Sequence, residues 1–305
     1  MSIPKKVTIM EVGPRDGFQS VKPWIETADK ITVILNLFAA GVDKMEAVSF
    51  ISPKAIPQMR DAAEVIAAIR DRVDMERVFA LVGNLRGAQQ AFDAGVSNIT
   101  FVISASEAHN LSNVRRTPAE SLELLKAVRE ELPSMHVKLS LATAFGCPFT
   151  GKVSLEQIRF VVDGALQQGV NDICLCDTIG VASPLLTEQI LLSMRELYGF
   201  NGDVKWSMHF HNTRGFAAAN TYAALKLGID RFETAAGGLG GCPFAPGASG
   251  NMATEDLVFM LNDMGIDCNA DLGKTLSAAE HMNLSLNLCT DSKINRVTMH
   301  KIFPR

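Results

Sequence analysis

Several features that mark other classes of protein are missing from this sequence. It has no run of about 18 apolar residues, so it predicts no transmembrane helix, and it opens with neither a secretory signal nor an Arg- and Ser-rich presequence. Its formal net charge of −4 gives no electrostatic reason to bind nucleic acid or a membrane surface. Its six cysteines show no disulfide framework and no zinc-site spacing. We therefore expect a soluble, cytoplasmic protein that binds neither nucleic acid nor a membrane.

The apolar segments indicate an α/β fold. With 305 residues, 47% of them hydrophobic, the chain can bury a large core. Short apolar runs, typical of strands buried on both faces, alternate with helix-like segments. The expected strands are 7–12, 44–50, 77–82, 98–103, 136–142, 172–177, 205–211 and 231–236. The expected helices are 27–40, 56–72, 85–94, 118–132, 154–168, 184–197, 215–227 and 254–264.

Eight strand–helix units in one series favour a (β/α)8 TIM barrel. The alternative is an open, doubly wound sheet, but no G-x-G-x-x-G follows the first strand to support it. We expect residues 1–268 to form the barrel and residues 269–305 to form a short C-terminal helical extension packed on it, because that remainder is too short for an independent domain.

Two histidines at the end of the seventh strand predict a metal site. His209 and His211 are two residues apart, so their imidazoles share one face of the strand. Asp16 follows the first strand, close to the seventh in a closed barrel, and Asn251 could add an amide oxygen. This ligand set has no thiolate and suits a divalent cation such as Mg²⁺ or Mn²⁺. The alternative is a pair of ordinary strand histidines with satisfied hydrogen bonds.

The segment 237–251, GGLGGCPFAPGASGN, holds six glycines after the last expected strand. Such a segment is either a flexible surface loop or an active-site loop whose backbone passes close to a ligand. Cys242 lies inside it, and its thiol could transfer a proton or simply pack. Arg15, next to Asp16, could stabilise a developing enolate oxygen or pair structurally with Glu46 or Asp177.

Five motifs resemble the 3-hydroxy-3-methylglutaryl-CoA lyase family. They are GPRDGFQ (13–19), EAVSFISPK (46–54), CDTIG (176–180), HFHNTRG (209–215) and GLGGCPFAPGASGN (238–251). The broader superfamily, including isopropylmalate and homocitrate synthases, resembles this chain only in the Arg-Asp pair and the H-x-H. An acetyl-CoA-dependent condensing synthase is therefore a weaker alternative, and a non-catalytic barrel that binds a ligand is a third.

The resemblance implies a metal-dependent carbon–carbon lyase. It also implies that the protein forms a homodimer and acts in leucine catabolism. Mg²⁺ or Mn²⁺ would be held by Asp16, His209, His211 and Asn251. Arg15 would stabilise the enolate, Cys242 and His209 would take part in proton transfer, and Glu46 and Asp177 would support the site. The expected reaction is retro-Claisen cleavage of a 3-hydroxyacyl-CoA, most simply hydroxymethylglutaryl-CoA to acetoacetate and acetyl-CoA.

An acyl-CoA substrate brings phosphates that local groups must bind. Residues near the strand ends are candidates for contacts with substrate or CoA: Gln19, Lys22, Asn110, Arg115 and Thr178, with Lys54 and Lys138 as further cations. Each cation could equally be an ordinary surface charge.

Some positions depart from the family pattern. Asn212 and Arg214 replace an acid and an aromatic after the seventh strand, Ser140 stands near a usual tyrosine, and Pro246 stands where glutamine is common. A new arginine could recognise a different carboxylate. Citramalyl-CoA or a longer-branched 3-hydroxyglutaryl-CoA is therefore an alternative substrate.

Overall fold

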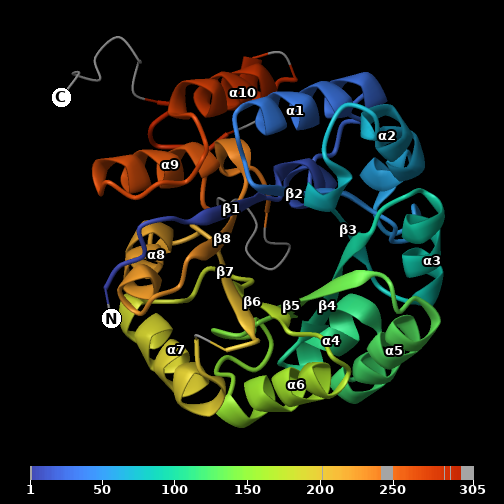
Figure 1. The fold of residues 1–305 in the computed structure, drawn as a ribbon, viewed down its shortest axis with the longest axis vertical. Helices are drawn as coiled ribbons and strands as arrows, with labels where there is room; N and C mark the ends of the chain where they lie inside the picture. The colour runs from blue at the N-terminus through green and yellow to red at the C-terminus, as the bar shows by residue number, and fades with distance from the viewer. Residues whose placement is uncertain (1, 201, 242–249, 285, 289, 297–305) are drawn as a thin grey trace.

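The structure is a computed structural model that describes residues 2–200, 202–241, 250–284, 286–288 and 290–296. Its eight strands are all parallel and close into a barrel in chain order, with β8 pairing back to β1 (Figure 1). The strands are β1 (Thr8–Glu11), β2 (Lys44–Ser49), β3 (Val78–Val82), β4 (Asn98–Ser104), β5 (His136–Ala142), β6 (Asp172–Asp177), β7 (Lys205–Phe210) and β8 (Arg231–Thr234). The TIM-barrel prediction is confirmed.

Helices surround the barrel because each strand presents an outer apolar face that must be covered (Figure 1). The helices that follow the strands in turn include α1 (Thr27–Ala39), α2 (Ala62–Ile69), α3 (Leu85–Asp93), α5 (Pro118–Glu131), α6 (Leu155–Gln167), α7 (Pro184–Tyr198), α8 (Ala217–Lys226) and α9 (Thr254–Asp263). The helix expected over 56–72 is divided, with a 3-10 turn, η2 (Pro57–Met59), ahead of α2. In the part of the chain that the structure describes, no helix is long and apolar enough to cross a membrane.

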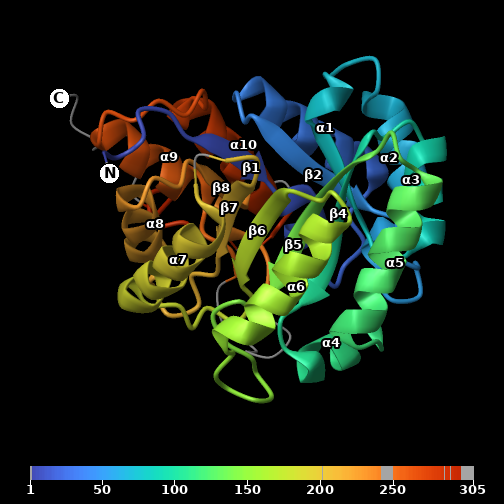
Figure 2. The same ribbon diagram turned by 60° about the horizontal axis from the view of Figure 1, so that its bottom comes forward.

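Two helices extend the basic pattern. The short α4 (Glu107–Val114), which the periodicity did not predict, follows β4, and Ser106 caps it by accepting a hydrogen bond from the His109 amide. Figure 2 shows α4 beyond the end of β4. The second, α10 (Leu272–Leu284), packs against α1 and α9.

The interior of the barrel is unusually charged. TIM barrels commonly fill this space with branched apolar side chains. Here Glu46, Lys138, Asp172 and Glu233 are all at most 4% exposed and come from strands. Burying a charge is costly unless it is paired, so the pairing of these groups determines what the barrel can do.

Candidate active site

The turn after β1 places the first two functional residues. The chain forms a π-helical turn, η1 (Gly13–Gly17), rather than continuing as a strand, so Arg15 and Asp16 lie close together. Arg15 Nη1 donates to Asp16 Oδ1 at 2.6 Å, and Arg15 Nε donates to Glu46 Oε1 on β2. The guanidinium is thus held between two carboxylates. The predicted pairing of Arg15 with Glu46 is present, and pairing does not remove Arg15 from the site, since it also contacts Asp16.

The expected metal ligands converge at the carboxyl ends of the strands. Asp16, His209 and His211 each offer a ligand atom, and these three atoms lie within 4.8 Å of one another. Asn251 Nδ2 donates to Asp16 Oδ2 at 2.7 Å and to the Leu239 carbonyl at 2.9 Å. All four residues that the sequence predicted as ligands therefore meet at one point.

The donor set fits a divalent cation. Asn251 Oδ1 and His211 Nδ1 are both buried, and neither has a hydrogen-bond partner among the described residues. Buried polar atoms without partners are costly, and a cation would satisfy atoms of this kind. Burial raises the pKa of Asp16, but the charges of Arg15, His209 and His211 outweigh this effect and hold the pKa below its usual value. Asp16 is thus an ionised carboxylate, which suits Mg²⁺ or Mn²⁺.

The sequence did not predict the interior position of two charged residues beneath the candidate ligands. Glu233 on β8 lies directly across from His209 in the β7–β8 register, and His209 Nδ1 is 2.9 Å from Glu233 Oε2. Lys138 on β5, expected as a candidate for phosphate binding, is 3% exposed and forms an ion pair with Glu233. It is therefore an interior residue that CoA phosphates cannot reach. Charges inside a barrel can be recognised only once the strand register is known.

The two histidines have opposite electrostatic environments. Burial lowers the pKa of His209, but the hydrogen bond to Glu233 and the nearby charges of Cys176, Glu233 and Asp16 outweigh burial and raise the pKa to about 9. Burial and the neighbouring His209 charge lower the pKa of His211 to about 4. His211 is therefore a neutral imidazole with a lone pair available, the form that binds metals.

Asp177 has a local structural task. Its two oxygens accept hydrogen bonds from the Val181 and Ala182 amides at 2.8 and 3.1 Å. Burial raises its pKa to about 6, against the effect of these hydrogen bonds. Asp177 thus shapes the loop after β6, which accords with a supporting role.

Three of the predicted substrate contacts have defined surroundings in the structure. Gln19 Nε2 donates to Asp16 Oδ1 at 2.8 Å, and Lys22 is exposed and lines a cavity of about 660 Å³ beside Leu239 and Gly240. Thr178 Oγ1 accepts from the Thr143 amide at 2.7 Å. Gln19 and Lys22 thus lie in or beside the site.

Asn110, a predicted substrate contact, is held by contacts within the protein. The residue is fully buried in α4, and both of its N–H groups are used, because Nδ2 donates to the Arg116 carbonyl and to Ser121 Oγ at 2.8 Å each. Arg115 is exposed and ends α4 with a φ of 58°.

Arg214 forms hydrogen bonds with the backbone of a neighbouring loop. Its Nη1 donates to the carbonyls of Ile179 and Gly180 at 2.8 and 2.9 Å. The side chain is exposed and joins the loop after β7 to the loop after β6. The expectation that this arginine recognises an acyl carboxylate stays a prediction.

The glycine-rich segment is held at both ends by glutamate side chains that sequence reasoning missed. Glu11 accepts hydrogen bonds from the Ala236 amide and from Thr254 Oγ1, and Glu255 accepts from the Gly237 amide. Gly240 has a φ of +134°, and a Cβ there would lie 2.6 Å from Asn251 Nδ2, so only glycine fits beside this ligand. Cys242 and Pro246 lie outside the described residues.

Comparison with known proteins identifies the family. Residues 6–282 match the HMGL-like family. The chain belongs to this family. It is 44% identical over 282 residues to a hydroxymethylglutaryl-CoA lyase of Bacillus subtilis, which covers 92% of this chain and 93% of that protein. The HMGL-like resemblance expected from the five motifs is therefore confirmed.

Two further HMGL-like relatives bear on the substrate. An HMG-CoA lyase structure from Acinetobacter baumannii, in complex with coenzyme A and 3-methylmalate, is 36% identical with a TM-score of 0.91, covering 100% of this chain and 99% of that one. An (R)-citramalyl-CoA lyase of Chloroflexus aurantiacus is 38% identical over 291 residues, covering 92% of this chain and 91% of that protein.

Proposed function

We propose that this protein is a divalent-metal-dependent lyase that cleaves the C2–C3 bond of a 3-hydroxyacyl-CoA. Hydroxymethylglutaryl-CoA is the first candidate substrate, and acetoacetate and acetyl-CoA are the products. The observation that carries the proposal is the meeting of Asp16, His209, His211 and Asn251 beside a guanidinium at the carboxyl end of the barrel. Membership of the HMGL-like family supports it, as does the coenzyme A complex of the related lyase.

The four ligand residues would hold the cation, Mg²⁺ or Mn²⁺, which supplies Lewis-acid polarisation of substrate oxygens. A base removes the proton from the C3 hydroxyl, the C2–C3 bond breaks, and C3 becomes a ketone. The bonding electron pair passes to C2 and the thioester as an enolate. Arg15 is a fixed positive charge, oriented by Glu46 and Asp16, that is suited to stabilising this oxyanion. C2 is then protonated, for which the Cys242 thiol is the candidate donor.

The alternative substrate is citramalyl-CoA, favoured by the 38% identity to the citramalyl-CoA lyase. Both substrates are 3-hydroxyacyl-CoA esters and undergo the same cleavage, so the metal and arginine roles are common to both. A cytoplasmic location, homodimer assembly and a role in leucine catabolism remain predictions.

Acetyl-CoA release tests the proposal. Purified protein is incubated with Mg²⁺ and either hydroxymethylglutaryl-CoA or citramalyl-CoA, and the products are separated by chromatography. We expect acetyl-CoA from at least one ester and loss of release in EDTA. No release from either ester, or full release in EDTA, would refute the metal-dependent lyase. Free CoA formed only when acetyl-CoA and a 2-oxo acid are both present would identify a condensing synthase instead.

A further inference from the structure

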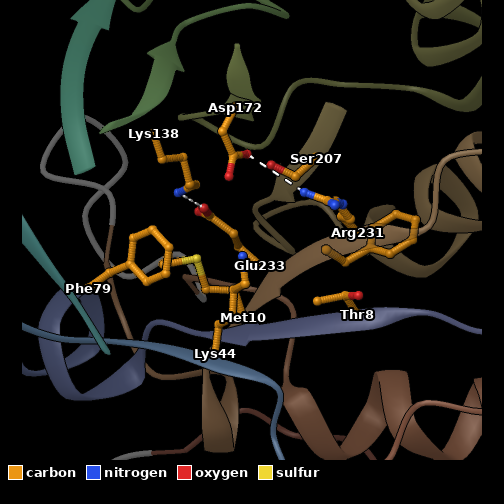
Figure 3. Close-up of a pocket in the computed structure, with 10 residues that line it drawn as sticks. Thr8, Met10, Lys44, Phe79, Lys138, Asp172, Ser207, Arg231 and Glu233 are labelled. Atoms are coloured by element: carbon orange, nitrogen blue, oxygen red, sulfur yellow. Dashed lines mark ion pairs between the residues drawn. The ribbon is translucent and has the colours of Figure 1, made fainter. Parts of the chain in front are cut away.

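A chain of buried charged groups runs from the middle of the barrel to the metal ligands. Lys138 forms an ion pair with Glu233, and Glu233 accepts a hydrogen bond from His209 Nδ1 at 2.9 Å. The three residues come from β5, β8 and β7 and are at most 6% exposed. Figure 3 shows the Lys138 ammonium directed at the Glu233 carboxylate across the barrel interior.

The contact with Glu233 fixes which nitrogen of His209 can bind a cation. An ionised carboxylate accepts hydrogen bonds but donates none, so Nδ1 must carry the proton. In the neutral imidazole that binds a cation, the Nε2 lone pair is then left to face Asp16 and His211, whose ligand atoms lie within 4.8 Å of the His209 ligand atom. Carboxylates that hold a ligand histidine in this way set its tautomer and its ring orientation.

Glu233 has space to leave this position. It lines a cavity of about 20 Å³ at the amino ends of the strands, next to Lys138 and Ser207, and this volume suits about one water molecule. Ser207 Oγ in this cavity is buried and has no partner among the described residues. A Glu233 carboxylate without Lys138 could turn toward this cavity, and His209 would lose its acceptor.

Stability alone does not account for Lys138. A buried ion pair contributes little net stability compared with apolar side chains of the same volume, and among the residues that the structure describes this lysine has only Ser140 Oγ, at 3.4 Å, as a further hydrogen-bond partner.

We propose that Lys138 is a positioning residue, which holds Glu233 against His209 and thereby keeps His209 Nε2 oriented toward the metal. The inference rests on the proposed metal site but not on the identity of the substrate.

Manganese binding tests the inference without any substrate. Metal-free protein is titrated with Mn²⁺ alone, and free Mn²⁺ is followed by electron paramagnetic resonance. Lys138→Met and Glu233→Gln should each weaken Mn²⁺ binding by about 10- to 100-fold, the usual effect of changing an outer-shell partner. Lys138→Arg, which keeps the charge, should recover most of the affinity.

The double variant distinguishes positioning from a general effect. If Lys138 acts only through Glu233, Lys138→Met combined with Glu233→Gln should bind Mn²⁺ about as well as Glu233→Gln alone. Multiplied losses in the double variant would overturn the inference, as would unchanged affinity in Lys138→Met.

Another buried lysine provides the matched control. Lys30 is also 3% exposed and pairs with Asp61 at 2.9 Å, but it links α1 to the turn before α2. Lys30→Met should lower the melting temperature as Lys138→Met does and leave Mn²⁺ affinity unchanged. Equal loss of affinity in both variants would show that unfolding, and not positioning, is responsible. Absence of lyase activity with normal Mn²⁺ binding would refute the proposed function but leave this inference standing.

Discussion

Substituting Arg15 should separate its chemical role from its structural one. The guanidinium donates to Asp16 Oδ1 at 2.6 Å and to Glu46, and Arg15 is 9% exposed. An interaction made mainly in the transition state affects kcat more than KM. Arg15→Gln should therefore lower kcat by about 10²- to 10³-fold, or about 3–4 kcal/mol, as loss of one oxyanion donor does in other enzymes.

The same substitution should also destabilise the fold. Glu46 is 1% exposed and would be left as a buried carboxylate without its cationic partner. Breaking a buried ion pair in this way costs about 3–5 kcal/mol. A fall in activity could then reflect unfolding rather than chemistry, so stability must be measured alongside the rate.

A second variant resolves this ambiguity. Arg15→Gln combined with Glu46→Gln replaces the ion pair by two neutral amides, which should recover most of the lost stability but none of the lost kcat. The assays are acetyl-CoA release at saturating Mg²⁺ and calorimetric unfolding. If the double variant recovers kcat together with stability, Arg15 is a structural residue. If KM alone rises in Arg15→Gln, Arg15 binds substrate and does not stabilise the enolate.

Three further predictions follow from the site. His211→Ala should weaken Mn²⁺ binding by more than the 10- to 100-fold of an outer-shell change, and unchanged affinity would refute its role as a ligand. Burial raises the pKa of Glu255 from 4.5 to about 8, so the folded state keeps a proton that the unfolded chain releases, and stability falls as pH rises from 4.5 through 8. Glu255→Gln should thus gain more in melting temperature at pH 9 than at pH 6, and an equal gain at both would contradict the raised pKa. Arg214→Met should cost about 1 kcal/mol of stability and leave the preference between hydroxymethylglutaryl-CoA and citramalyl-CoA unchanged in kcat/KM; a changed preference would show that Arg214 contacts substrate.

The convergence of the candidate ligands could be predicted from the sequence because their placement depends on simple geometry. His209 and His211 share a face through the two-residue period of a strand, and the parallel order of the barrel brings every strand end to one rim. Asp16 needed only the closure of the barrel, which β1–β8 pairing provides. None of these steps required knowledge of side-chain packing.

The supporting residues could not be predicted because they depend on register and on local turns. Glu233 and Lys138 lie 95 residues apart, and only their positions on β8 and β5 bring them together inside the barrel. Asn110 resembled a residue of an exposed loop because the short α4, which buries it, has little apolar periodicity. Arg214 resembled a substrate contact, although its partners are backbone carbonyls that a sequence cannot reveal.

Two charged chains approach the ligand cluster from different sides of the barrel. Lys138 and Glu233 lead to His209, and Glu46 and Arg15 lead to Asp16. His209 contacts the Glu233 carboxylate, and Asp16 contacts the Arg15 guanidinium. Neither His209 nor Asp16 can therefore turn without breaking a buried ion pair or hydrogen bond. Once His209 has released its additional proton to bind a cation, the two cations and three carboxylates leave the cluster with a single net negative charge. A cluster that is rigid, buried and short of positive charge favours capture of a divalent cation in fixed geometry, and Arg15 remains as the positive charge that we propose stabilises the enolate.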